Sequence, residues 1–246
     1  MKNCPLSILL VLILVSSTSY SQRLSLGAKA AFNNTAVYND NLYNQVSYVK
    51  THANSFGAQI NLMFTKKWGM TTDILLSGQN QKYTLVDSSN TLNGESKFTY
   101  LDIPVLIKRK NKIGLYFEFG PMFSYLLTAK ETVLNSNGTL NYSNKDFKND
   151  FSTYGLSGVV GIGWDVKLSK RMMINIEGRG GYMFTDVTKH YPDAEVVPMF
   201  NSGQISLNSL LSHIDQSGSI NYARSTRIFT GINVGLHWVI VPMGLK

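Results

Sequence analysis

The sequence predicts an all-β fold: an eight-stranded antiparallel up-and-down transmembrane β-barrel with short periplasmic turns and long extracellular loops. Three patterns indicate it. Apolar and polar residues alternate with a period of two, short and long connections alternate along the chain, and one face of the strands is apolar. Only 15% of the residues are charged, against about 25% in typical soluble domains. No stretch beyond the first twenty residues is long and apolar enough for a membrane helix.

The chain begins with a segment typical of a signal peptide. Lys2 precedes an apolar run at residues 8–15, and small residues follow that run. The run is shorter than the roughly 20 residues that a spanning helix needs, which argues against a retained anchor. We therefore expect a signal peptide over residues 1–21 and one barrel domain over residues 22–246. The one cysteine, Cys4, lies in this leader, so the exported chain forms no disulfide.

Eight segments with period-two alternation are separated by connections of unequal length. The predicted strands are Leu24–Phe32, Phe56–Phe64, Trp68–Tyr83, Phe98–Lys108, Gly114–Leu127, Thr153–Leu168, Arg171–Phe184 and Arg227–Ile240. The short turns are Thr65–Lys67, Arg109–Ile113 and Ser169–Lys170, and the long polar loops are Asn33–Ser55, Thr84–Lys97, Thr128–Ser152 and Thr185–Thr226. Short turns at one end and long loops at the other are typical of bacterial outer-membrane barrels.

The two faces of the predicted strands differ in polarity. One face carries Leu, Ile, Val and Phe without a charge, as expected where a barrel contacts lipid. The other face carries glycines, amides and five acids with four bases: Lys29, Asp73, Asp102, Lys108, Glu118, Asp165, Lys167, Glu177 and Arg179. Eight strands leave interior room for side chains only, and charges withdrawn from water persist when they are paired. We therefore expect a salt-bridge network in the lumen. The alternative is a soluble lipocalin-like barrel with its apolar face inside.

Trp68, Trp164 and Trp238 all lie toward the short-turn ends of their strands, where we expect them to anchor the barrel at the membrane interface. The short turns and the C-terminus carry eight bases and no acid: Lys66, Lys67, Arg109, Lys110, Lys112, Lys170, Arg171 and Lys246. This asymmetry predicts a basic rim that faces anionic phospholipid headgroups, rather than binding to nucleic acid. The alternative is that the turns simply favour lysine.

Two neighbouring segments carry a family resemblance. YLDIPVLIKRK (Tyr100–Lys110) and GLYFEFGPMFSYLLTAK (Gly114–Lys130) resemble the Tyr-Leu-Glu-Ile-Pro, Lys and Gly-Pro pattern of PorT-like outer-membrane β-barrel proteins of the Bacteroidetes. IEGRGGY (Ile176–Tyr182) resembles a later strand of that family. The resemblance implies an outer-membrane barrel of the porin family and an accessory role in protein secretion. Pro104 and Pro121 belong to the shared pattern, and we expect a β-bulge at each.

The last predicted strand resembles the C-terminal β-signal that the barrel-assembly machinery reads. Asn233, Gly235, Trp238 and Ile240 supply its polar, glycine and spaced hydrophobic positions. The resemblance implies that this machinery is a partner during biogenesis and that outer-membrane lipid surrounds the mature protein.

The sequence gives no sign of a catalytic, cofactor or metal site. A hydrolase needs a nucleophile and a base within hydrogen-bond reach, and His52, His190, His213 and His237 are dispersed along the chain. Ser212 adjoins His213, but neighbouring residues on a strand point to opposite faces. Dispersed histidines also argue against a metal cluster. We therefore expect a non-enzymatic protein without a cofactor. Two functions stay open: a structural or interaction protein that meets a protein partner through its extracellular loops, and a barrel that transports or binds a small solute.

Overall fold

The computed structural model describes residues 23–39, 46–87, 90–135 and 140–241, and the predicted signal peptide lies outside them. Ten strands, one 3-10 helix and two α-helices account for most of this part of the chain. They are β1 (Arg23–Asn39), β2 (Val46–Val49), β3 (Thr51–Met63), β4 (Trp68–Asp87), β5 (Asn90–Lys110), β6 (Leu115–Asn135), β7 (Leu140–Asp146), η2 (Lys148–Asp150), β8 (Tyr154–Lys167), β9 (Met172–Met183), α2 (Asp193–Asn201), α3 (Leu207–Leu211) and β10 (Ser225–Val241). None of the helices in the described ranges is both long enough and apolar enough to span a bilayer.

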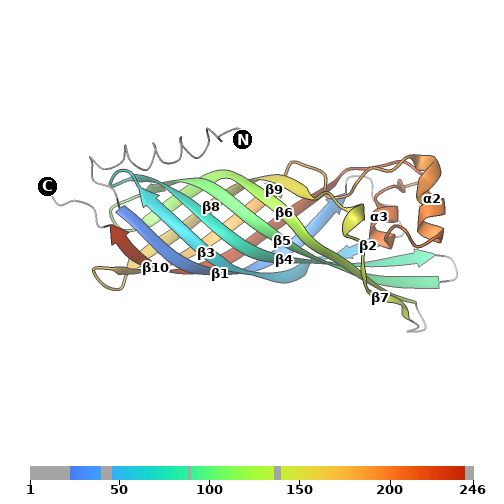
Figure 1. The fold of residues 1–246 in the computed structure, drawn as a ribbon, viewed down its shortest axis with the longest axis horizontal. Coiled ribbons are helices and arrows are strands. Elements are labelled where there is room, and N and C mark those ends of the chain that lie inside the picture. Colours follow the sequence, from blue (N-terminus) through green and yellow to red (C-terminus); the bar gives the residue numbers. More distant parts are fainter. Residues whose placement is uncertain (1–22, 40–45, 88–89, 136–139, 242–246) are drawn as a thin grey trace, which may run out of the picture.

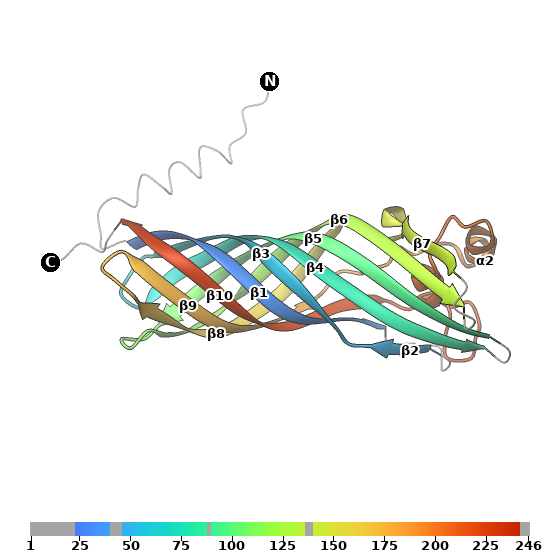
Figure 2. The ribbon, with the colours of Figure 1, turned by 90° about the horizontal axis from the view of Figure 1, so that it is seen from below.

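Eight of the strands form a closed antiparallel ring in the order β1-β3-β4-β5-β6-β8-β9-β10, and β10 pairs with β1 to complete it. Figures 1 and 2 show the ring as a long cylinder of tilted strands. β2 pairs with β4 and β7 pairs with β6 outside the ring. The predicted fold class, an eight-stranded up-and-down barrel, is confirmed.

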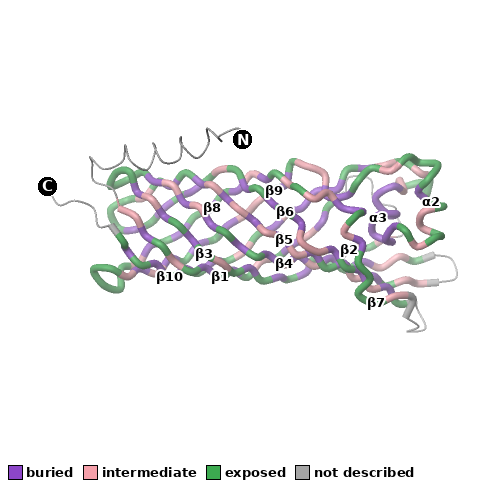
Figure 3. Tube along the Cα trace, in the orientation of Figure 1, coloured by how far each residue is buried: buried purple, intermediate pink, exposed green. Residues whose placement is uncertain are grey.

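The outer wall of the barrel is apolar and the inner wall is polar. Buried and exposed residues alternate along the strands (Figure 3). Large hydrophobic side chains such as Phe56, Val160 and Ile232 are about half exposed or more, whereas lysines, arginines and carboxylates inside are buried. This inside-out distribution is stable where lipid covers the apolar wall. The backbone is also compatible with lipid, because the backbone groups of a closed ring are paired within the sheet. A soluble barrel would have the opposite distribution.

Three of the four predicted long loops are wrong over most of their length, because the strands continue through them. β4 and β5 form one hairpin that stays paired as far as Asp87↔Asn90, and β6 continues to Asn135. These extensions lie beyond the apolar band, where pairs such as Thr84↔Asn93 are polar on both strands. Without a lipid-facing side, the alternation that identifies a strand in the sequence is absent.

The β-bulges expected at the two prolines are also wrong. The β5–β6 register is the same at Pro104↔Met122 and at Ile107↔Phe119, so no residue is inserted between these pairs. The ladder is only interrupted there, as expected because proline lacks the N–H that would donate. The register shift in this strand pair lies between Thr99 and Tyr100 instead.

The fourth long connection, between β9 and β10, folds over the long-loop end of the barrel. Its helices α2 and α3 lie beside the extensions of the β-strands (Figure 1). A hydrophobic cluster joins this connection to the strand extensions. Tyr83 and Val133 of the strands pack with Val196, Leu207 and Leu211 of the connection. We call residues 185–224 the cap. The cap gives the barrel a second, apolar core outside the membrane band.

Candidate functional site

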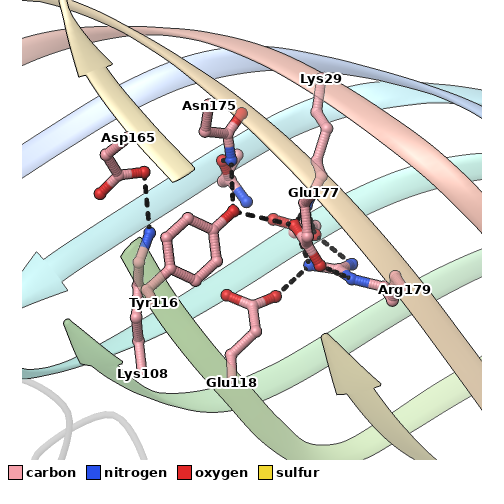
Figure 4. Close-up of polar contacts among 10 residues, drawn as sticks. Lys29, Lys108, Tyr116, Glu118, Asp165, Asn175, Glu177 and Arg179 are labelled. Carbon is pink, nitrogen blue, oxygen red and sulfur yellow. Dashed lines mark hydrogen bonds and ion pairs between the residues drawn. The ribbon is translucent and has the colours of Figure 1, made fainter. Parts of the chain in front are cut away.

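Arg179 on β9 occupies the centre of the lumen (Figure 4). Its Nη1 donates to Asp73 Oδ2 at 2.7 Å, its Nη2 to Glu118 Oε1 at 2.5 Å, and its Nε to Glu177 Oε1 at 2.6 Å. Lys29 Nζ joins the same group, at 2.8 Å from Glu177 Oε2 and 3.2 Å from Asp73 Oδ2. We call these five residues the central cluster. It ties β1, β4, β6 and β9 together across the barrel.

Glycines make room for the two long cations. Lys29 lies between Gly57 and Gly235 on the neighbouring strands, and Arg179 lies between Gly161 and Gly231. A Cβ atom at Gly161 would lie 2.6 Å from Glu177 Oε1, so a side chain there collides with the cluster. The glycine-rich inner face of the sequence therefore provides the space for these side chains.

A second group lies nearer the short-turn end. Asp165 accepts from Lys108 Nζ at 3.2 Å and from Lys110 Nζ at 2.6 Å. The Lys108 ammonium also lies 3.5 Å from the centre of the Tyr116 ring, and Tyr116 donates to Glu177 Oε2 at 3.3 Å. Tyr116 thus connects this group to the central cluster.

Lys167, predicted to belong to the lumen network, does not lie inside the barrel. It is exposed at the last position of β8. Its side chain is on the inner parity of the strand, but at this position the strand has reached the open rim and water covers the ammonium. Lys110, which the sequence placed in a basic turn, contacts Asp165 instead.

A third ion pair lies toward the long-loop end and was not predicted. Arg227 on β10 binds Asp102 on β5 through two nitrogens, at 3.0 and 2.9 Å. Ser124 Oγ donates to the same carboxylate at 2.6 Å, and the guanidinium lies 4.5 Å from the Tyr100 ring centre. Arg227 shares the inner parity of Asn233, and this periodicity is the signal that could have identified it.

Other polar groups of the lumen have no partner among the described residues. Both side-chain polar atoms of Gln79, the amide nitrogen of Asn233 and both ring nitrogens of His237 are buried without a hydrogen bond. Buried polar groups of this kind are usually satisfied by ordered water. The lumen is therefore polar between its ion pairs.

Above the third ion pair, two carboxylates hold the cap. Glu131 on the β6 extension accepts from Tyr83 at 2.6 Å and from the backbone N–H groups of Leu207 and Asn208 at 2.9 and 3.0 Å. Asp150 accepts from the N–H of Ser206 at 2.6 Å. Burial raises the pKa of Asp150 to about 6. One end of α3 is thus fastened to the barrel by hydrogen bonds to charged acceptors.

At the other end of α3, the fully buried His213 links α3 to Tyr191 within the cap. Its Nδ1 lies 2.8 Å from the carbonyl of Ser209, and its Nε2 accepts from the N–H of Tyr191 at 3.1 Å. Nε2 must be unprotonated to accept, so the ring is neutral with its hydrogen on Nδ1. Burial lowers the pKa of His213, in agreement with this state.

The structure places the three tryptophans on the outer wall near the short turns, each about half exposed. Trp164 is oriented by a hydrogen bond from Nε1 to the carbonyl of Ile113, at 2.9 Å. Of the predicted β-signal residues, Asn233 is buried inside, and Trp238 and Ile240 face outward. Their roles as interface anchors and as an assembly signal stay predictions.

No arrangement of described side chains resembles a catalytic or metal centre. Across the described ranges, no three His, Cys, Asp or Glu side chains lie close enough to hold a metal ion. His190 stacks on Tyr222, His52 stacks on Phe32, and His213 contacts backbone groups. The best-defined polar site is therefore the ion-paired lumen beneath the cap.

The chain is similar to solved outer-membrane barrels at low identity. Ail of Yersinia pestis, solved with the heparin analogue sucrose octasulfate, is 10% identical over 87% of this chain and 98% of its own, with a TM-score of 0.38. OprG of Pseudomonas aeruginosa is 10% identical over 90% and 96%, with a TM-score of 0.37. Neisserial surface protein A is 10% identical over 87% and 96%, with a TM-score of 0.35. No curated protein sequence matches the chain.

A family model gives a more specific result. The model described as outer membrane protein beta-barrel domain matches residues 16–189, which is more than half of the chain. The matched region includes seven strands of the ring, from β1 to β9. The chain therefore belongs to the outer membrane protein β-barrel domain family and is a protein of the bacterial outer membrane.

Proposed function

We propose that this protein is a non-enzymatic outer-membrane scaffold that conducts no solute and meets a protein partner through its cap. The observation that carries the proposal is the central cluster, in which Arg179 meets three carboxylates in the middle of an eight-stranded lumen. An aqueous channel usually needs about sixteen strands. A barrel that is filled and covered leaves its cap and strand extensions as the surface for interaction.

A finer part of the proposal is an accessory role in protein secretion. It rests on the resemblance of Tyr100–Lys110 and Gly114–Lys130 to PorT-like proteins. The second candidate function is small-solute transport or ligand binding. It is favoured by the unpartnered polar atoms of Gln79 and His237, which are suited to holding water or a polar solute.

Site-specific crosslinking in intact cells tests the interaction. The only cysteine of the chain is Cys4, in the predicted leader, so a single introduced cysteine labels one position. Val197→Cys places a crosslinker on an exposed position of α2, and Lys112→Cys places it on an exposed turn at the opposite end as the matched control.

We expect a discrete adduct of one size from Val197→Cys and none of that size from Lys112→Cys. Absence of an adduct from the cap, or the same adduct from both ends, contradicts the interaction. Solute flux through the purified protein in vesicles contradicts the closed-barrel part and favours transport.

A further inference from the structure

A groove on the outside of the barrel combines bases with apolar side chains. It lies at the short-turn end, has a volume of about 460 Å³, and is lined by Lys67, Arg109 and Lys112 on its charged side. Leu115, Phe117 and Ile162 line its apolar side, and all three are exposed on the outer wall. The groove therefore begins at the basic rim and continues onto the lipid-facing surface.

Arg109 is the central residue of this groove. It faces outward from β5, paired in register with Trp68 on one side and Phe117 on the other. Its guanidinium carbon lies 5.3 Å from the Trp68 ring centre, a cation–π contact that holds the charge at the level of the tryptophans. Among the described residues, no carboxylate forms an ion pair with Arg109. A charge beside lipid is unfavourable unless an anion accompanies it.

The two turns that carry the bases are held in place. The N–H of Lys110 donates to the carbonyl of Lys67 at 2.7 Å, and the N–H of Ile113 donates to Asn111 Oδ1 at 3.1 Å. Lys110 itself forms an ion pair with Asp165 inside the barrel. Three exposed bases thus lie around the groove: Lys67 and Lys112 on two turns that are fixed relative to each other, and Arg109 at the end of β5.

We propose that this groove binds one anionic phospholipid, with its phosphate against Arg109 and Lys67 and an acyl chain along Phe117 and Ile162. Guanidinium groups bind phosphate through two hydrogen bonds, and bases near a membrane surface attract anionic headgroups. The apolar side of the groove favours a lipid over a soluble anion or an acidic protein. The site lies at the opposite end from the cap and is independent of the proposed function.

Native mass spectrometry of the detergent-solubilised protein tests the site, with phosphatidylglycerol as the probe and phosphatidylcholine as the neutral comparison. The test variant is Lys67→Gln with Arg109→Gln. The matched control is Lys170→Gln with Arg171→Gln, which removes the same charge from an exposed turn elsewhere on the rim. The mobility of unboiled samples on gels establishes that each variant is folded.

We expect wild type to prefer phosphatidylglycerol, and the test variant to lose about 25-fold in affinity, since each base near a membrane surface contributes about fivefold. The control should keep the wild-type affinity. Equal losses in both variants, or equal binding of the two lipids, overturn the proposal. Competition by inorganic phosphate or an acidic peptide as effective as the lipid identifies a soluble anion or a protein as the ligand instead, and overturns it too. If the test variant does not fold, the wild-type protein alone tests the proposal. Its preference for phosphatidylglycerol over phosphatidylcholine must then become weaker at high salt.

Discussion

At the scale of single residues, Arg179 illustrates how a lumen can be both charged and closed. Three of its atoms each meet a carboxylate, on β4, β6 and β9. The guanidinium offers five donors in a fixed plane, so one side chain can donate hydrogen bonds to several acids without an intervening water. Removing it leaves three carboxylates close together with only Lys29 to balance them.

We predict that Arg179→Ala destabilises the barrel by about 3–5 kcal/mol, because it leaves buried charges unpaired. Lys167→Ala is the matched control, since this lysine lies exposed on the rim; surface charges of this kind contribute about 0–1 kcal/mol. Unfolding by denaturant in lipid vesicles measures both free energies. Equal effects of the two substitutions would mean that the central cluster contributes no more than a surface charge.

His213 makes the packing of α3 within the cap depend on pH, because both of its hydrogen-bond partners, Ser209 and Tyr191, belong to the cap. Because burial lowers its pKa in the folded state, the unfolded state binds more protons between that value and about 6.5. The contribution of His213 to stability is therefore full above pH 6.5 and is lost as the pH falls. Protonated Nε2 can no longer accept from the N–H of Tyr191.

Asp150 acts with the opposite sign. Its folded pKa is raised to about 6, so the stability it contributes is full below about pH 4 and is lost as the pH rises to about 6. The His213 prediction is therefore tested in an Asp150→Asn background, where the amide oxygen still accepts from the N–H of Ser206.

We expect hydrogen exchange at residues 207–211, corrected for its intrinsic rate, to show weaker protection at pH 5 than at pH 7. Adding His213→Gln should abolish that difference. If the difference in protection persists in the His213→Gln variant, another titratable group causes it and the prediction is wrong.

At the scale of elements, the outer faces of the strands form a band that lipid covers. Val160 lies near the middle of β8 and is 54% exposed, whereas Leu168 lies just beyond the end of the strand and is equally exposed. We predict that Val160→Lys costs about 2–4 kcal/mol and Leu168→Lys about 0–1 kcal/mol, because the cost of a lysine depends on its depth in the bilayer. Folding titrations in vesicles measure the two values. Similar costs would show that the apolar band is not where lipid lies.

The sequence predicts the membrane-embedded strands well because lipid imposes a strict alternation on them. Phe56, Val160 and Ile232 all face outward, as expected from that period. The strand extensions escape prediction because no lipid covers their outer face, and because their inner face combines apolar contacts to the cap with buried polar residues such as Glu131. α2 contains Pro198 and neither cap helix is long, so the helical period is too short to detect.

The lumen was predictable in its composition but not in its pairings. Parity placed Lys29, Asp73, Glu118, Glu177 and Arg179 on the inner face. The pairing of bases with acids depends on the tilt of the strands around the ring. That tilt cannot be deduced from the sequence of a single strand. Arg227 was missed because it begins a strand directly after a polar loop, and Lys167 was misplaced because parity gives no depth.

At the scale of the whole molecule, successive layers of ion-paired side chains block the lumen along the barrel axis. From the short-turn end these are Asp165 with its lysines, the central cluster, and Asp102 with Arg227. Glu131 and Asp150 then fasten the cap over the mouth. Each layer crosslinks at least two strands of the ring, so opening a path requires more than the loss of a single ion pair.

Planar-bilayer recording of the purified wild-type protein tests this closure most directly. We predict a baseline current without discrete steps. We predict the same result for a variant that lacks residues 193–211, because the ion pairs of the lumen do not depend on the cap. Folding of both proteins is checked by their heat-dependent gel mobility, since a closed barrel resists detergent until boiled. Steady, reproducible single-channel steps from the wild type would contradict the closed lumen and support a solute channel in its place.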